Sequence, residues 1–98
     1  MSKYEIFLKP TAIKDFDRLS RFDAVTVSDV MEECLSDEPA KESKSRIKRL
    51  KGISDPDYRL RVGDYRVFYS IDEVVRQVNV LRVLHKDETQ DYYEELKP

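Results

Sequence analysis

The sequence predicts an α+β fold in which helices pack on one face of an antiparallel sheet. Three observations lead to this class. Residues 4–8 alternate as a strand does, apolar residues recur at helical spacing between 11 and 35, and three strand-like segments follow between 57 and 86. We therefore expect an N-terminal strand, an αα-hairpin packed on one face, three consecutive C-terminal strands and a short C-terminal helix, in a single domain covering residues 1–98.

The N-terminal third supplies the first strand and the αα-hairpin. Residues 4–8, YEIFL, are apolar on both faces, which predicts a strand inside the sheet, and Pro10 ends it. Thr11 can cap the first helix, and a second helix is expected from about Asp23. Its single apolar stripe consists of Val27, Val30, Met31, Cys34 and Leu35. Met31 and Cys34 are therefore interpreted as core residues rather than ligands.

The rest of the chain predicts a loop, two hairpins and a helix. The polar segment 36–45 contains a proline and is expected to be a loop, and residues 47–52 form either a helical turn or an extended piece. Strands are expected on both sides of Gly63-Asp64, with a second turn at Asp72-Glu73 before the last strand, 75–86. The final segment, 87–98, has the pattern of a short helix.

Charge is distributed unevenly along this 98-residue chain. Its formal net charge is −2, yet residues 41–69 hold nine basic and four acidic residues, which gives +5. The remainder holds nine basic and sixteen acidic residues, which gives −7. Such a local positive field attracts phosphates or acidic proteins. For residues 41–51 alone, an ordinary solvated basic loop is the alternative interpretation.

Composition argues against several classes of protein. The single cysteine excludes an internal disulfide, and no apolar run is long enough for a membrane span or resembles a secretion signal, so a cytoplasmic protein without a membrane partner is expected. One histidine and one cysteine give no zinc spacing, and there is no glycine-rich phosphate loop. We therefore expect neither a metal nor a cofactor.

The stretch DYRLRVGDYRVFY, residues 57–69, places cations against each other. A two-residue loop at Gly63-Asp64 sets Arg61 directly opposite Arg66, and like charges in that position are destabilising. Guanidinium groups persist together when an anion lies between them, and their paired N–H groups match phosphate oxygens. We call the surface formed by Arg59, Arg61 and Arg66 the arginine face. The alternative is that these arginines pair with nearby acids such as Asp57 and Asp64.

A second turn at Asp72-Glu73 would extend the arginine face onto the last strand. Arg66 would lie opposite Asn79, Phe68 would lie opposite Gln77, and His85 would share the face, unless a β-bulge moves it away. No helix is expected to cover this face. Its aromatic residues, Phe68, Tyr92 and Tyr93, would then be exposed and able to stack on unpaired bases.

The segments LKGISDPDYRLRVGDYRVFYSIDE and VNVLRVLHKDETQDYY carry a family resemblance. Together they resemble the RelE-like branch of the RelE/ParE toxin superfamily, whose order of elements matches the one expected here. The resemblance implies the toxin of a type II toxin–antitoxin system and a metal-independent endoribonuclease. Such toxins cleave mRNA in the ribosomal A site through attack of the 2′-hydroxyl. A RelB-like antitoxin, bound in a hetero-oligomer, is the implied partner, alongside mRNA and the ribosome.

The resemblance also implies roles for individual residues. Arg59 and Arg61 occupy two cationic positions, one of which is a proposed general base in the family, and Arg66 corresponds to the arginine that steadies the phosphate. Lys86 corresponds to an arginine acting on the leaving group, and Tyr92 to a base-stacking tyrosine, with Tyr93 as its alternative. Further RNA contacts are expected from Lys48, Arg49, Lys51 and Phe68.

The proton acceptor departs from the family pattern. Arginine cannot accept a proton at neutral pH, and imidazole is the side chain whose ordinary pKa, ~6.5, suits that task. His85 is the only histidine, and a lysine such as Lys86 gives up a proton more readily than an arginine does. We therefore expect catalysis from Arg59, Arg61, Arg66, His85, Lys86 and Tyr92. His85 and Lys86 are expected to act together near the end of the strand, and either one could transfer the proton. A ParE-like inhibitor of DNA gyrase, or a catalytically weak toxin that mainly binds its antitoxin, are the alternatives.

Overall fold

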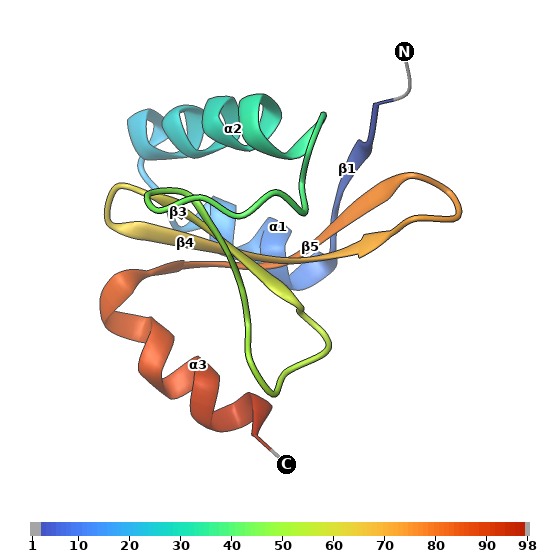
Figure 1. Cartoon of the computed structure of the whole chain (residues 1–98). Coiled ribbons are helices and arrows are strands. Elements are labelled where there is room, and N and C mark those ends of the chain that lie inside the picture. The colour runs from blue at the N-terminus through green and yellow to red at the C-terminus, as the bar shows by residue number, and fades with distance from the viewer. Residues whose placement is uncertain (1–2, 98) are drawn as a thin grey trace.

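The computed structural model describes residues 3–97, which form a five-stranded sheet with helices on both faces (Figure 1). The strands are β1 (Glu5–Leu8), β2 (Ile47–Arg49), β3 (Tyr58–Val62), β4 (Tyr65–Asp72) and β5 (Gln77–His85). The helices are α1 (Pro10–Asp17), α2 (Arg21–Leu35), the 3₁₀ helix η1 (Lys86–Glu88) and α3 (Thr89–Leu96). The order across the sheet is β1-β5-β4-β3-β2. The predicted α+β class is confirmed.

The first strand lies at an edge of the sheet, so its predicted place inside the sheet is wrong. β1 pairs with β5 alone, in parallel, from Glu5 opposite Gln77 to Leu8 opposite Val80. The other neighbouring strands pair antiparallel. One apolar face of β1 packs on the core, whereas Phe7 on the other face is 47% exposed. Apolar character on both faces therefore did not indicate a central strand here.

Local signals explain where the first two helices begin. α1 starts at Pro10, one residue before the predicted Thr11 cap, because proline's fixed φ suits the first turn of a helix. α2 starts at Arg21 because the Ser20 side chain accepts a hydrogen bond from the Asp23 amide, at 3.1 Å. Within residues 3–97, no helix combines the length and apolar character needed to cross a membrane.

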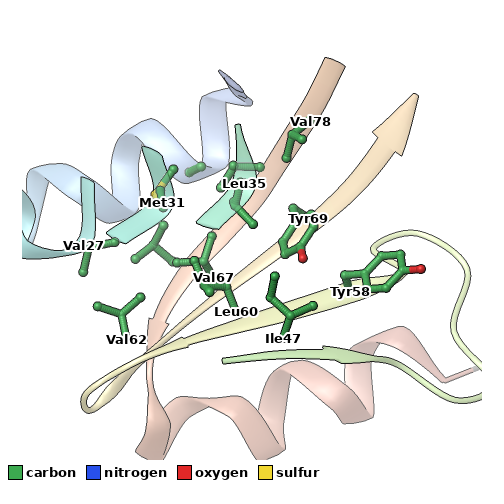
Figure 2. Packing of buried hydrophobic residues seen from close by; sticks show 13 residues of the cluster. Val27, Met31, Leu35, Ile47, Tyr58, Leu60, Val62, Val67, Tyr69 and Val78 are labelled. Atoms are coloured by element: carbon green, nitrogen blue, oxygen red, sulfur yellow. The ribbon is translucent and has the colours of Figure 1, made fainter. Parts of the chain in front are cut away.

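The main hydrophobic core lies between α2 and one face of the sheet (Figure 2). Val27, Met31 and Leu35 point from α2 toward Leu60 and Val67 on β3 and β4. These five side chains are at most 4% exposed. Cys34 is partly buried against the same cluster. The prediction that Met31 and Cys34 are core residues is confirmed.

The last helix covers part of the opposite face, so the expectation of helices on one face only is wrong. In Figure 1, α2 and α3 lie on opposite sides of the sheet. A second cluster joins Phe68 on β4 and Leu84 on β5 to Tyr92 on α3. Leu96 packs against this cluster and lies one helical turn after Tyr92, so both residues share one face of α3. Burial of that apolar stripe holds α3 against the sheet.

Side chains from α1 close the part of β5 that β1 leaves unpaired. Beyond Val80, the Thr11 hydroxyl donates to the Leu81 carbonyl, at 2.6 Å, and the Val83 amide donates to the Asp15 carboxylate, at 2.8 Å. Asp15 also accepts hydrogen bonds from Arg82 Nε, at 2.8 Å, and Arg18 Nη2, at 2.6 Å. Arg82 lies 5.5 Å from the Tyr92 ring centroid. One buried carboxylate thus connects α1 to β5 and, through Arg82, to α3.

The first hairpin has the predicted register and the second does not. Val62 lies opposite Tyr65, and Arg61 lies opposite Arg66. In the second hairpin, Asp72 pairs with Gln77 and a bulge intervenes between Phe68 and Tyr69, so Phe68 lies opposite Arg82 and Arg66 opposite Leu84. The predicted pairs of Arg66 with Asn79 and of Phe68 with Gln77 are wrong. The bulge also places His85 opposite Tyr65, away from the arginine face.

Candidate functional site

Two rows of cations cross the strands on the arginine face. In the first cation row, Arg61 lies opposite Arg66. The Arg61 amide also donates a hydrogen bond to the Arg46 carbonyl, so backbone pairing extends one residue before β2 and Arg46 belongs to this row. In the second cation row, Lys48 on β2 lies opposite Arg59 on β3. Residues directly opposite share a face, and the two rows are two residues apart along β3. The hairpin therefore gathers its cations on one surface.

The arginines of this face lack the acidic partners that the alternative interpretation requires. Among residues 3–97, Arg59, Arg61 and Arg66 make no ion pair with a carboxylate. Arg66 Nη1 donates instead to the carbonyls of Gly63 and Tyr65, both at 2.9 Å. Burial, and then the charges of Arg59 and Arg61, lower the pKa of the Arg66 guanidinium. An anion placed between these groups would relieve their repulsion.

The predicted aromatic platform is mostly buried. Phe68 is fully buried and Tyr92 is 7% exposed, because α3 packs over both, so the prediction that they are exposed for stacking is wrong. Burial raises the pKa of Tyr92 to about 12, and its hydroxyl stays protonated at neutral pH. Tyr93 is half-buried, and its ring contacts Phe68 edge-on at 5.7 Å. Of the three aromatic residues, Tyr93 alone lines a pocket beside the cations.

His85 lies on the side of the sheet that faces α2. Its ring makes an edge contact with Tyr65 at 5.5 Å, and the Tyr65 hydroxyl donates to Asp23 of α2 at 2.9 Å. His85 also caps η1, because its Nδ1 accepts the Asp87 amide at 3.2 Å and its own amide donates to Glu88 at 3.0 Å. The sequence-based position of His85 among the arginines is therefore wrong, and the β-bulge is the physical reason.

Lys86 lies beside the turn of the arginine hairpin. Its amide donates to the Asp64 carbonyl at 2.7 Å, and its Nζ lies 3.5 Å from Asp64 Oδ1. Both side chains are more than half exposed, so this ion pair is weak and readily exchanged. Within the described part of the chain, no three histidine, cysteine, aspartate or glutamate side chains are arranged to hold a metal ion.

A pocket beside the second cation row contains residues that sequence reasoning missed. It measures about 460 Å³ and lies between the β2–β3 loop and α3, which extend to the same side of the sheet (Figure 1). Its lining includes four of the residues predicted to contact RNA, Lys48, Arg49, Lys51 and Tyr93, and Arg59, which was predicted to be catalytic. Gln90 of α3 and Lys97, the residue after α3, also line it. Arg46 of the first row was also missed. The available signal was that Arg46 precedes Lys48 by two residues, because residues two apart on a strand point to the same face of the sheet.

Asp57 precedes β3 and lines a neighbouring pocket of about 630 Å³. Its Oδ1 is buried and has no hydrogen-bond partner in the described residues. Burial raises the pKa of the Asp57 carboxyl, despite the opposing effect of Arg49. A raised carboxyl pKa contributes stability that is fully present below the unfolded pKa, ~3.9, and is lost as pH rises through the folded value. At neutral pH the buried charge therefore weakens the fold.

We accordingly expect Asp57→Asn to raise the midpoint of thermal unfolding at pH ~7, because the amide removes the buried charge while keeping the side-chain shape. The gain should disappear near pH ~3, where the wild-type carboxyl is protonated. Thermal denaturation followed by circular dichroism at both pH values measures the difference. Asp37→Asn, at an exposed loop carboxylate, is the control and should have no effect. Equal shifts in the two variants would show that burial of Asp57 is not the cause.

Comparison with solved structures identifies the class of fold. The chain is similar to a chain of the RelBE2 toxin–antitoxin complex from Mycobacterium tuberculosis, with 29% identity and a TM-score of 0.70, covering 85% of this chain and 98% of that one. It is similar to a mutant of the E. coli toxin RelE in the free state, with 25% identity, a TM-score of 0.69 and coverage of 96% and 94%. A chain of the RelE–RelB complex from Pyrococcus horikoshii has 27% identity, a TM-score of 0.62 and coverage of 88% and 97%. The fold is that of a RelE-like toxin.

The sequence itself identifies the family. The profile of the family described as "ParE toxin of type II toxin-antitoxin system, parDE" matches residues 6–90. The chain therefore belongs to the ParE toxin family, within the RelE/ParE superfamily, and is a toxin of a type II toxin–antitoxin system. Toxin–antitoxin complexes among the similar structures support an antitoxin as its partner. No curated protein sequence matches the chain.

Proposed function

We propose that this toxin is an endoribonuclease that cleaves mRNA in the ribosomal A site of the cytoplasm, without a metal, and that a RelB-like antitoxin silences it in a hetero-oligomer. The observation that carries the proposal is the arginine face. Arg59, Arg61 and Arg66 gather there without a carboxylate partner among residues 3–97. A nucleic-acid phosphate supplies the anion that this arrangement lacks. The likeness to RelE toxins favours RNA as its source.

The chemistry follows from the groups that line the face. The 2′-hydroxyl loses its proton to water and its oxygen bonds to the neighbouring phosphorus. The bond from phosphorus to the 5′-oxygen then breaks, leaving a 2′,3′-cyclic phosphate and a 5′-hydroxyl. Arg61 and Arg66 stabilise the crowded phosphorane through paired N–H groups, and Lys86 delivers a proton to the leaving oxygen. Lys86 takes this role rather than His85 because it lies at the turn of the arginine hairpin.

Gyrase inhibition is the second candidate function, because the matching family profile is that of ParE toxins. One pair of assays separates the two functions: primer extension on an mRNA with and without translating ribosomes, and supercoiling by DNA gyrase. Cleavage that requires ribosomes is the expected result. Loss of supercoiling without cleavage would replace the proposal with gyrase inhibition. The absence of both cleavage and gyrase inhibition would indicate a catalytically weak toxin whose main partner is its antitoxin.

Lys86→Gln is expected to slow mRNA cleavage by on the order of 100-fold, because a positioned proton donor contributes about that much or more. His85→Ala should change the cleavage rate less than about threefold, since its imidazole faces α2, and should instead lower stability by about 1 kcal/mol through loss of the cap. Single-turnover cleavage, RNA binding and thermal unfolding distinguish these effects. A cleavage defect as large in His85→Ala as in Lys86→Gln would return the proton transfer to His85.

A further inference from the structure

A pocket on the α2 side of the sheet combines acidic and aromatic side chains. It measures about 320 Å³ and lies between the start of α2 and the β3–β4 turn, which are close together in Figure 1. Its polar lining consists of Asp23, Thr26, Asp64, Tyr65 and His85, and no lysine or arginine of residues 3–97 lines it. We call it the acidic pocket. Two carboxylates thus lie beside a space large enough for one long side chain.

The two carboxylates of the acidic pocket can accept further hydrogen bonds. Asp23 Oδ2 accepts the Tyr65 hydroxyl at 2.9 Å, whereas Asp23 Oδ1 accepts none from the described residues. Asp64 Oδ1 lies 3.5 Å from the exposed ammonium of Lys86. The hydrogen bond to Asp23, then burial, then the charges of Asp23, Asp64 and Glu88 raise the pKa of the Tyr65 hydroxyl. The electrostatic potential at this ring is therefore negative, which favours a cation beside it.

A guanidinium group matches both kinds of surface in the acidic pocket. Its paired N–H groups bind carboxylate oxygens, and its planar face stacks on an aromatic ring. The rings of Tyr65 and His85 make an edge contact at 5.5 Å, so packing holds this aromatic surface in place. Val27 and Val62, which lie close to each other in Figure 2, offer apolar contact to an aliphatic stem. The lining therefore suits an arginine side chain.

The helix surface beside the acidic pocket is apolar and exposed. Phe22 is 78% exposed and Val25 is 52% exposed. Phe22 lies four residues before Thr26, so the two share a face of α2 and Phe22 lies beside the pocket. Phenylalanine is enriched at the centre of protein–protein interfaces. An exposed aromatic ring next to a charged pocket therefore suits a protein segment that carries both an arginine and an apolar residue.

The charge of this surface distinguishes its partner from RNA and from a silencing antitoxin. Asp23 and Asp64 repel phosphates, and a segment that covers the arginine face needs acidic residues rather than basic ones. The acidic pocket lies on the α2 side of the sheet, so a segment bound there leaves the arginine face free. A basic protein segment and an RNA strand can therefore bind at once. Proteins that bind RNA carry clustered lysine and arginine, so the ribosome offers both partners.

We propose that the acidic pocket binds an arginine side chain from a basic protein segment of the translating ribosome, while mRNA lies on the arginine face. This inference rests on the proposed action of the toxin on ribosomes. Asp23 and Asp64 bind the guanidinium group, and Tyr65 stacks on it. Phe22 packs against an apolar residue of the same segment. The two sides of the sheet thus bind the protein and the RNA of one target.

Titration with Nα-acetyl-arginine methylamide tests the chemistry of the pocket. NMR spectra that resolve single amides should show saturable shifts at Asp23 and Asp64, with a Kd on the order of a few millimolar for so small a ligand. The matching citrulline compound has the same shape without the charge, and should bind at least about fivefold more weakly. Equal binding of the two compounds would show that the pocket is not a cation site.

Affinity for ribosomes tests the partner. The ribosomes carry an mRNA with 2′-O-methyl groups in the A-site codon, so that binding is measured without cleavage. Phe22→Ser with Asp23→Asn should raise the Kd about tenfold, because an apolar contact and a charged hydrogen-bond acceptor are lost. The asparagine still accepts the Tyr65 hydroxyl, so the fold should be retained, and circular dichroism confirms it.

The matched control is Val74→Ser with Asp29→Asn. It also removes one exposed apolar side chain and one exposed carboxylate, but neither residue lines the acidic pocket. Its Kd for ribosomes should stay within about twofold of the wild-type value, because isolated surface charges are screened. Both double variants should also bind a fluorescein-labelled 2′-O-methyl hexaadenylate within about twofold of wild type, since the arginine face is unchanged.

The outcomes that overturn the acidic pocket differ from those that overturn the nuclease. Equal effects of the two double variants on ribosome binding would overturn the proposal, and so would a matching loss of hexaadenylate binding in the pocket variant. Binding of the arginine compound without an effect on ribosomes would reject the ribosomal partner and leave the antitoxin or a second copy of this chain as the source of the arginine. Pocket-dependent ribosome binding by a toxin that leaves mRNA intact would support the pocket and refute the nuclease. Cleavage on ribosomes that both variants bind equally well would do the reverse.

Discussion

Arg66→Ala is expected to reduce mRNA cleavage on the order of 100- to 1000-fold, the usual effect of removing one donor from a developing oxyanion. Folding should be little affected, with a change in the free energy of unfolding within about 1 kcal/mol. The substitution removes the hydrogen bonds from Arg66 to Gly63 and Tyr65, but it also relieves repulsion from Arg59 and Arg61. Primer extension and urea denaturation measure the two quantities.

The comparison variants for Arg66 separate charge from geometry. Arg66→Lys keeps the charge but loses the paired N–H groups, so its cleavage rate should lie between those of wild type and Arg66→Ala. Arg21→Ala removes an exposed arginine of α2 on the far side of the sheet and should leave cleavage unchanged. A loss of stability in Arg66→Ala of several kcal/mol would mean that Arg66 is a structural residue. Full activity would remove the arginine face from the mechanism.

Asp15→Ala is expected to lower the free energy of unfolding by about 3–5 kcal/mol, because it leaves a partly buried guanidinium and a buried amide without their acceptor. The carboxylate is 3% exposed and accepts hydrogen bonds from Arg82, Arg18 and the Val83 amide. Such a loss is a large fraction of the ~5–15 kcal/mol that stabilises an ordinary domain. Urea denaturation followed by circular dichroism measures it.

Asp17→Ala is the matched control for Asp15, since Asp17 lies in the same helix but is exposed and makes no side-chain hydrogen bond or ion pair with residues 3–97. Its effect should stay within about 0.5 kcal/mol. Asp15→Asn should fall between the two, because the amide oxygen still accepts the Val83 amide while the charge beside Arg82 is lost. If Asp15→Ala is no less stable than Asp17→Ala, the closure of β5 by α1 contributes little.

The parts of the site that the sequence predicted depend on short-range rules. Alternation around Gly63-Asp64 sets Arg61 opposite Arg66 because a two-residue turn fixes the register of a hairpin, and Gly63 adopts the positive φ of 56° that such a turn needs. Helical spacing likewise predicted that Met31 and Cys34 pack in the core. In each case the spacing within one hairpin or one helix was sufficient.

The parts that could not be predicted depend on long-range packing. The turn after β4 contains no glycine or asparagine; Asp72 instead accepts the amides of Val74 and Val75, at 3.0 and 3.3 Å, and Arg76 adopts a φ of 56° that is uncommon for arginine. The bulge leaves Leu81 without an opposite residue on β4. Neither feature has a local sequence signal. The bulge moved His85 off the arginine face and placed Leu84 beside Phe68, where α3 packs over both.

The unpaired Leu81 links the position of His85 to the residues of β5 that support the last helix. With the bulge, Leu84 of β5 packs against the last helix, and the His85 imidazole lies on the opposite side of the sheet, which faces α2. Without it, strict alternation would place Leu81, Val83 and His85 on the face that α3 covers and would turn Leu84 away from Tyr92. A strand without the bulge would therefore present its histidine on the cationic face and support the last helix with different apolar residues.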